Sequence, residues 1–172
     1  VQVDDLASAL AAQSNGAAMI YLGNTWQAKP EFTAAGLEKL ARNHGEVYYI
    51  LPAIAGENEI AGLKNKLLEF AQTPLSGVVV GNLWALELVR ELGLKQKIVS
   101  DFNFNIFNSQ ALAFCREQGI ARAGLSLELN WRQIENLCPV TALETLAYGN
   151  LPLMVSEHCP VGALAGGRTA SQ

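Results

Sequence analysis

Short runs of β-branched and aromatic residues alternate along the chain with longer segments in which apolar residues recur at helical spacing. The runs predict strands at 18–22, 47–51, 78–80, 98–100, 121–125 and 145–148. The segments between them predict helices at 31–43, 57–72, 83–92, 109–118 and 131–137, most of which end at Gly or Pro. Strict alternation of strand and helix is typical of parallel strands joined by right-handed crossovers, so we expect an α/β fold.

An internal repeat narrows the architecture. Residues 82–94 align with residues 108–120 at an offset of 26, which superposes Asn, Ala-Leu, Arg-Glu and Gly. In each copy the Asn is suited to begin a helix and the Gly to end it, and Asn130 is placed to begin a third. Equal units in series favour a ring of parallel strands over an open sheet. With outer strands at 1–3 and 153–155 the count reaches about eight, which predicts a compact or incomplete TIM-like (β/α) barrel.

Length and composition limit the class of protein. The chain has 172 residues, of which 50% are hydrophobic and only 16% charged, so it has the composition of a folded domain. We expect one barrel-like domain over 1–165 and a flexible tail at 166–172, in a chain that is part of a longer protein. A net charge of -4 supplies no general basic field for nucleic acid, and no apolar run approaches the length of a membrane span.

Polar residues gather where two predicted strands end, which is where α/β folds bind ligands. Alternation after the strand at 98–100 places Asp101, Asn103 and Asn105 on one face. The next unit repeats the pattern with Ser126 and Glu128. We expect these five residues to line one cavity, with Asp101, Ser126 and Glu128 as candidate catalytic groups and the two Asn as ligand-binding groups. The alternative interpretation is two strand ends that merge into exposed loops, with Asn108 and Asn130 as helix caps.

Two further strand ends carry Tyr148 and Asn150, and Ser156, His158 and Cys159. We predict that Tyr148, Asn150 and His158 bind ligand. Adjacent side chains of an extended chain point apart, so the second group predicts no catalytic triad. The sequence has only two histidines and no Cys-x-x-Cys pair, which excludes a histidine-rich metal centre.

The three cysteines are too few and too widely spaced for a disulfide framework, which indicates a reducing, cytoplasmic setting. Cys115 lies in an apolar helical stretch and Cys138 precedes a Pro at the end of another helix, so both are expected to be small core residues. Cys159 lies between His158 and Pro160 in a segment with the composition of a loop. It is therefore the cysteine that we expect to have a functional role.

Five segments carry motifs in a fixed order along the chain: NGAAMIYLG (15–23), DFNFNIFNS (101–109), LSLELN (125–130), YGNLPLM (148–154) and HCPVG (158–162). Together they give the chain a resemblance to the collagenase-like peptidase family of unassigned catalytic type, which also includes bacterial enzymes that hydroxylate tRNA and ribosomal RNA. It implies a barrel-like βα domain and a role for Cys159 as an iron–sulfur ligand. Other cysteines of the family follow this motif, so the resemblance implies a cluster in the full-length parent and no cofactor in this chain.

Three functions remain open from the residues. In the first, the chain is a module of a collagenase-like peptidase and is inactive in isolation, because the spacing pairs no nucleophile with a base. Alternatively it is a ligand-binding or scaffold barrel of an RNA-hydroxylating enzyme, or a non-enzymatic scaffold for other domains of the parent. The substrate would be a small molecule, a peptide or RNA, and no membrane partner is expected.

Overall fold

The computed structural model describes residues 1–23, 33–43, 45–152, 155 and 164. Its strands are β1 (Gln2–Val3), β2 (Ile20–Leu22), β3 (Val47–Ile50), β4 (Gly77–Val80), β5 (Lys97–Ser100), β6 (Ile120–Gly124) and β7 (Ala142–Glu144). Its helices are α1 (Leu6–Ser14), α2 (Ala34–Asn43), α3 (Glu57–Phe70), α4 (Leu83–Glu91), α5 (Ser109–Glu117), α6 (Trp131–Glu135) and the 3-10 turn η1 (Phe102–Phe104).

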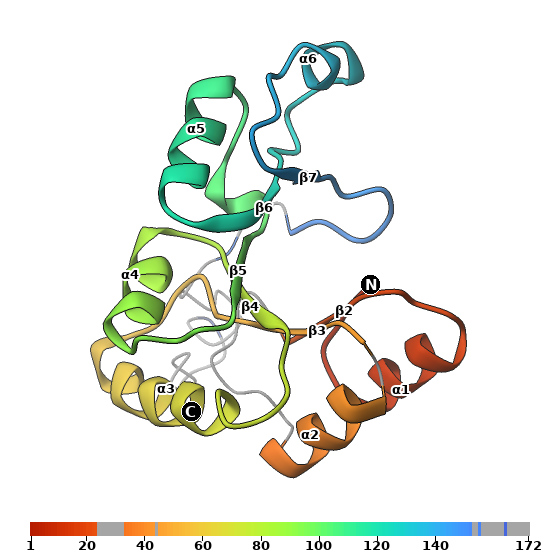
Figure 1. Ribbon diagram of the computed structural model, residues 1–172, viewed down its shortest axis with the longest axis vertical. Coiled ribbons are helices and arrows are strands. Elements are labelled where there is room, and N and C mark those ends of the chain that lie inside the picture. The colour runs from red at the N-terminus through yellow and green to blue at the C-terminus, as the bar shows by residue number, and fades with distance from the viewer. Residues whose placement is uncertain (24–32, 44, 153–154, 156–163, 165–172) are drawn as a thin grey trace.

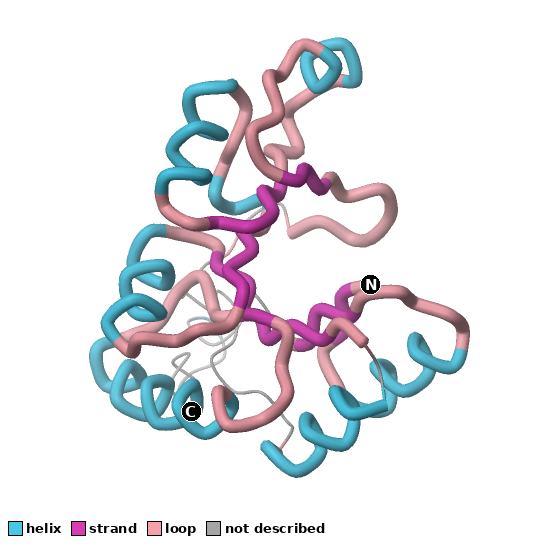
Figure 2. The backbone as a smooth tube through the Cα atoms, viewed as in Figure 1, coloured by secondary structure: helices cyan, strands magenta, loops and turns pink. Residues whose placement is uncertain are grey.

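The strands form one parallel sheet in the order β1-β2-β3-β4-β5-β6-β7. The sheet curls into a C shape with the helices on its outer side, and its open side lies between β1 and β7 (Figure 1). The tube view shows the same curvature, with the strands lining the inside of the C (Figure 2). The predicted α/β, incomplete TIM-like fold is therefore confirmed as a seven-stranded half-barrel. The strand predicted at 153–155 falls mostly outside the described residues.

Alternation along each strand separates two apolar layers. In β3, Val47 and Tyr49 pack in the main core under the helices, whereas Tyr48 and Ile50 face the hollow side. The cluster on this inner side also includes Val79 on β4 and Val99 on β5. All four residues of β3 are buried, as expected for a parallel sheet that is covered on both faces.

The caps predicted from the repeat are present. The side chains of Asn82 and Asn108 accept hydrogen bonds from the backbone N–H groups three residues later, as does that of Asn130. Gly93 and Gly119 have φ of 61° and 76°, the left-handed conformation that ends a helix. The repeat therefore marks two equivalent βα units.

Helix α1 and strand β7 differ most from the sequence prediction. Helix α1 was not predicted, because its Ala-rich sequence gives little contrast between apolar and polar faces; Asp5 caps it by accepting the N–H of Ser8 at 2.8 Å. The strand predicted at 145–148 is wrong, since β7 covers Ala142–Glu144. The Thr141 hydroxyl donates to the carbonyls of residues 120 and 121 and so aligns the chain with β6 before the β-forming residues of 145–148 are reached.

No helix among the described ranges combines the length and the hydrophobicity needed to cross a bilayer. The division into a domain at 1–165 and a tail at 166–172 stays a prediction, because the tail lies outside the described residues.

Candidate functional site

Asp101 begins the connection that leaves β5. It was expected to continue an alternating strand with Asn103 and Asn105, and that expectation is wrong because the chain turns into η1. The Asp101 carboxylate caps the turn by accepting the backbone N–H and the side-chain amide of Asn103, both at 2.9 Å. Asn105 closes the turn in the left-handed conformation, with φ of 56°. A short acidic side chain can compete for backbone donors in this way, which ends the strand at Ser100.

The following unit also turns instead of extending. Ser126 is 5% exposed, and its hydroxyl donates to the Asn105 side-chain oxygen at 2.9 Å. Glu128 is exposed, and its backbone N–H points to the Ser126 hydroxyl at 3.4 Å. The two connections are therefore adjacent, as their parallel strands require, and a hydrogen bond joins Ser126 to Asn105. Because the acceptor is an amide oxygen, this contact gives the hydroxyl no base.

Glycines on both sides allow the chain to pass close to Asp101. A Cβ at Gly81, just after β4, would lie 3.2 Å from a carboxylate oxygen of Asp101. A Cβ at Gly124, in β6, would lie 2.6 Å from the carbonyl oxygen of Ser100 and 2.7 Å from the backbone carbon of Asp101. The carboxylate is thus enclosed by the ends of three neighbouring strands, where side chains on either neighbour would displace it.

Burial is the dominant influence on the acidity of this carboxyl. It raises the pKa of Asp101 from 3.8 to about 6, and the two hydrogen bonds from Asn103 offset only part of the effect. A carboxyl with this pKa exchanges protons near neutral pH, which suits it to act as a proton acceptor or donor. Of the candidate catalytic residues, Asp101 is the one whose surroundings change its chemistry.

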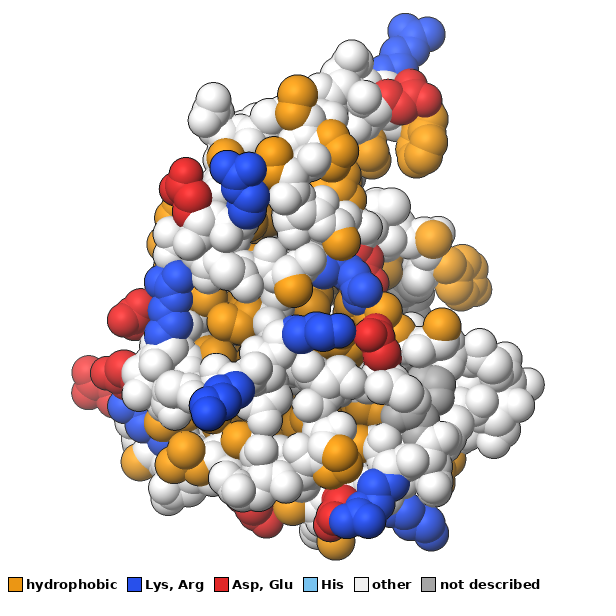
Figure 3. All heavy atoms as spheres, in the orientation of Figure 1, with side chains coloured by type: hydrophobic (Ala, Val, Ile, Leu, Met, Phe, Trp, Pro, Cys, Tyr) orange, Lys and Arg blue, Asp and Glu red, His pale blue; other side chains and the backbone are white. Residues whose placement is uncertain are grey.

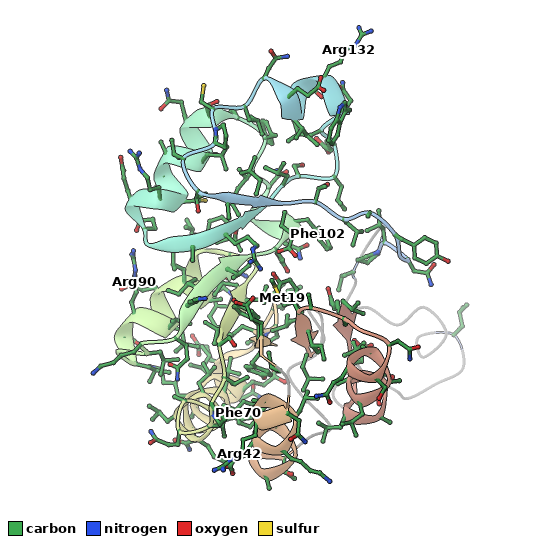
Figure 4. All side chains as sticks on the ribbon, turned by 45° about the vertical axis from the view of Figure 1, so that its right-hand side comes forward. Met19, Arg42, Phe70, Arg90, Phe102 and Arg132 are labelled. Carbon is green, nitrogen blue, oxygen red and sulfur yellow. The ribbon has the colours of Figure 1, made fainter. Side chains whose placement is uncertain are left out.

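A second polar group lies on the inner side of the half-barrel. The Tyr21 hydroxyl donates to Glu144 at 2.6 Å and accepts from the Arg122 guanidinium at 3.1 Å, while Arg122 also lies against the sulfur of Met19. Burial raises the pKa of Tyr21, so its phenol stays protonated. Figure 3 shows charged side chains gathered over the middle of the molecule, and Figure 4 places Met19 on the inner side of the sheet. This group was not predicted from the sequence. The feature that could have indicated it is the presence of charged residues inside short, otherwise apolar strands.

A cavity of about 330 Å³ lies in the helical layer between α4 and α5. Its lining includes Asn103, Phe114 and Cys115, but not Asp101, Ser126 or Glu128. It is therefore not the shared cavity that the polar pattern predicted. Asp101 and Asn103 both lie close to Gly81, but only Asn103 also borders this cavity.

The other predicted ligand-binding residues do not join Asp101 in a described contact. Tyr148 is 97% exposed and Asn150 is exposed, both in the segment that follows β7. His158 and Cys159 lie outside the described residues, as does Ser156. Their roles in ligand or iron–sulfur binding stay predictions.

The two described cysteines differ from one another. Cys115 is fully buried, as predicted, and burial raises the pKa of its thiol to about 11. Cys138 is exposed, so the expectation that it is a core residue is wrong. The cause is the early end of α6 at Glu135, which leaves Cys138 in the connection beyond it, where its N–H donates to Ser109 at 3.0 Å. Within the described ranges, no three His, Cys, Asp or Glu side chains are grouped closely enough to hold a metal ion.

Thiol labelling of the native chain should modify Cys138 within the mixing time of a mild reagent and Cys115 only on unfolding. Reactivity requires an accessible thiolate, and Cys115 lacks both access and acidity. Mass spectrometry of quenched samples assigns the modified cysteine. Equal labelling rates for the two thiols under native conditions would show that α5 does not bury Cys115 as described.

The sequence was compared with curated proteins and with sequence models of protein families. No curated protein matches the chain significantly. The sequence model of Peptidase family U32 matches residues 4–172, which is nearly the whole chain and includes every strand from β2 to β7. The chain therefore belongs to Peptidase family U32.

Proposed function

We propose that this chain is the ligand-binding half-barrel of a collagenase-like peptidase-family protein, with Asp101 as the group that exchanges a hydrogen bond or proton with a peptide ligand. The observation that carries the proposal is the enclosed carboxyl of Asp101, with its pKa raised to about 6, at the carboxyl ends of β4, β5 and β6. Ligands of βα barrels bind at this end of the strands. Membership in the family supports a peptide as the ligand.

The same geometry argues against peptide cleavage by the chain alone. Ser126 donates to an amide and Glu128 lies exposed beyond it, so neither side chain is paired as a nucleophile with a base. We also propose that Cys159 contributes to an iron–sulfur cluster only with cysteines of a longer parent protein. In this scheme the half-barrel recognises the ligand, and other parts of the parent complete the chemistry. A cytoplasmic setting is part of the proposal.

Purified chain should bind gelatin-derived peptides, and Asp101→Asn should weaken that binding by about tenfold or more at pH 7.5, where the wild-type carboxylate accepts a peptide N–H. Isothermal titration calorimetry measures both affinities. Glu69→Gln, an exposed carboxylate on α3, is the matched control and should bind as wild type. Equal affinity of Asp101→Asn and wild type would contradict the proposed role.

The isolated chain should not cleave fluorescein-labelled gelatin above the blank rate, because the Ser126 hydroxyl is hydrogen-bonded to an amide and the Cys115 thiol is buried with a raised pKa, so neither is activated by a base. The alternative, a barrel of an RNA-hydroxylating enzyme, predicts RNA binding in place of peptide binding. The net charge of -4 disfavours it, and a filter-binding assay with tRNA at physiological salt should give no retention. Cleavage abolished by Ser126→Ala, or tight tRNA binding, would replace the proposal by the corresponding alternative.

A further inference from the structure

β7 is one of the two edge strands of the half-barrel. It has three residues and pairs on one side with β6, where the N–H of Leu125 donates to the carbonyl of Glu144 at 2.8 Å. The segment behind it, residues 145–152, is largely exposed, with Tyr148 almost fully in solvent. Backbone pairing alone therefore gives this edge of the sheet few contacts.

One side-chain contact ties β7 to the other half of the molecule. The hydrogen bond from the Tyr21 hydroxyl to Glu144 joins β7 to β2, at a separation of 123 residues in the sequence. Its length of 2.6 Å is typical of a strong bond from a hydroxyl to a carboxylate. Arg122 on β6 donates to the same hydroxyl and so supports the phenol from the opposite side.

From this geometry we propose that Arg122, Tyr21 and Glu144 form a clasp that ties β7 to β2 and so keeps β7 paired with β6. Arg122 orients the phenol, and the phenol donates its proton to Glu144, so both partners of the hydroxyl are satisfied. Loss of the clasp lets β7 separate from β6 more often, and the segment 145–152 behind β7 separates with it.

The clasp can be broken by removing a single oxygen atom. Tyr21→Phe keeps the ring that packs edge-on against Tyr48, with centroids 5.3 Å apart, and deletes only the hydroxyl. Tyr48→Phe is the matched control, because its hydroxyl lies on the same face of the sheet but donates to Glu46 at 3.4 Å and does not reach β7.

Amide hydrogen exchange measured by NMR tests the proposal, with Leu125 as the reporter of β7 pairing and Leu51, which donates to Val79 at 2.9 Å, as the internal reference. We expect Tyr21→Phe to raise the exchange rate of Leu125 relative to Leu51 by about tenfold or more, and Tyr48→Phe to leave that ratio unchanged. Glu144→Gln, which retains an acceptor oxygen, should give a smaller increase.

The proposal is overturned if the ratio in Tyr21→Phe stays within about twofold of wild type, a change too small for the loss of a hydrogen bond to a charged group. It is also overturned if the exchange rates of Leu125 and Leu51 rise together, because the hydroxyl then stabilises the whole fold and not the pairing of β7 in particular. Limited proteolysis provides the second readout, and only Tyr21→Phe and Glu144→Gln should be cut faster within 145–152.

Discussion

Asp101→Asn should raise the free energy of unfolding at pH 8 by up to about 3 kcal/mol, the value that follows from a pKa raised from 3.8 to about 6. In the wild-type chain the folded state binds the Asp101 proton more tightly than the unfolded state does. The stability from this group is therefore full below a pH of about 4, is lost as the pH rises through about 6, and stays lost above that. Asparagine carries no charge and avoids the cost at every pH.

Urea denaturation from pH 4 to pH 8 measures the effect. Wild type should become less stable relative to Asp101→Asn across this range, with the change centred between pH 4 and 6. Glu69→Gln, on the exposed face of α3, should show no such difference from wild type. A constant gap between wild type and Asp101→Asn at all pH values would mean that the substitution acts through packing and not through the charge.

Gly124→Ala should destabilise the fold by about 3 kcal/mol or more, at the upper end of the range for overpacking. The new methyl group would lie 2.6 to 2.8 Å from backbone atoms of Ser100 and Asp101, which cannot move away as a flexible side chain can. Separation of β5 from β6 relieves the clash, and this change also displaces the Asp101 carboxylate. Peptide binding should weaken together with stability.

Gly62→Ala is the matched control for this prediction. Gly62 lies inside α3, and a methyl group added there would meet nothing within 4 Å, so Ala should stabilise the chain by about 0.5 to 1 kcal/mol through helix propensity. Thermal denaturation followed by circular dichroism compares the two variants. If Gly124→Ala melts at the wild-type temperature, β5 and β6 are not packed as closely as described at the end where Asp101 lies.

Much of the fold could be predicted from local sequence patterns. The strands β3, β4 and β5 lie within a residue or so of their predicted positions, because buried parallel strands are short runs of β-branched and aromatic residues. The Asn caps were predictable because a cap acts over three residues of sequence. Helix α1 was missed because alanine is compatible with the helix without marking a buried face.

The candidate site was only partly predictable. Asp101 was identified because it follows a buried strand, but the alternation of polar and aromatic residues after it mimics a strand and conceals the turn of η1. The clasp could not be predicted, since Tyr21 and Glu144 meet only through the curvature of the whole sheet. The predicted strand also began after Glu144, at residue 145, so the pattern gave no indication that this side chain points inward.

The pH titration of the Asp101 side-chain carboxyl, followed by carbon-13 NMR and assigned by the loss of its signal in Asp101→Asn, tests the central claim most directly. Because this carboxyl is enclosed by Gly81, Gly124 and η1 at the carboxyl ends of β4, β5 and β6, we predict a midpoint near pH 6. A midpoint near pH 4, the value of a carboxyl in water, would contradict this claim, because Asp101 would then be an ordinary solvated turn residue.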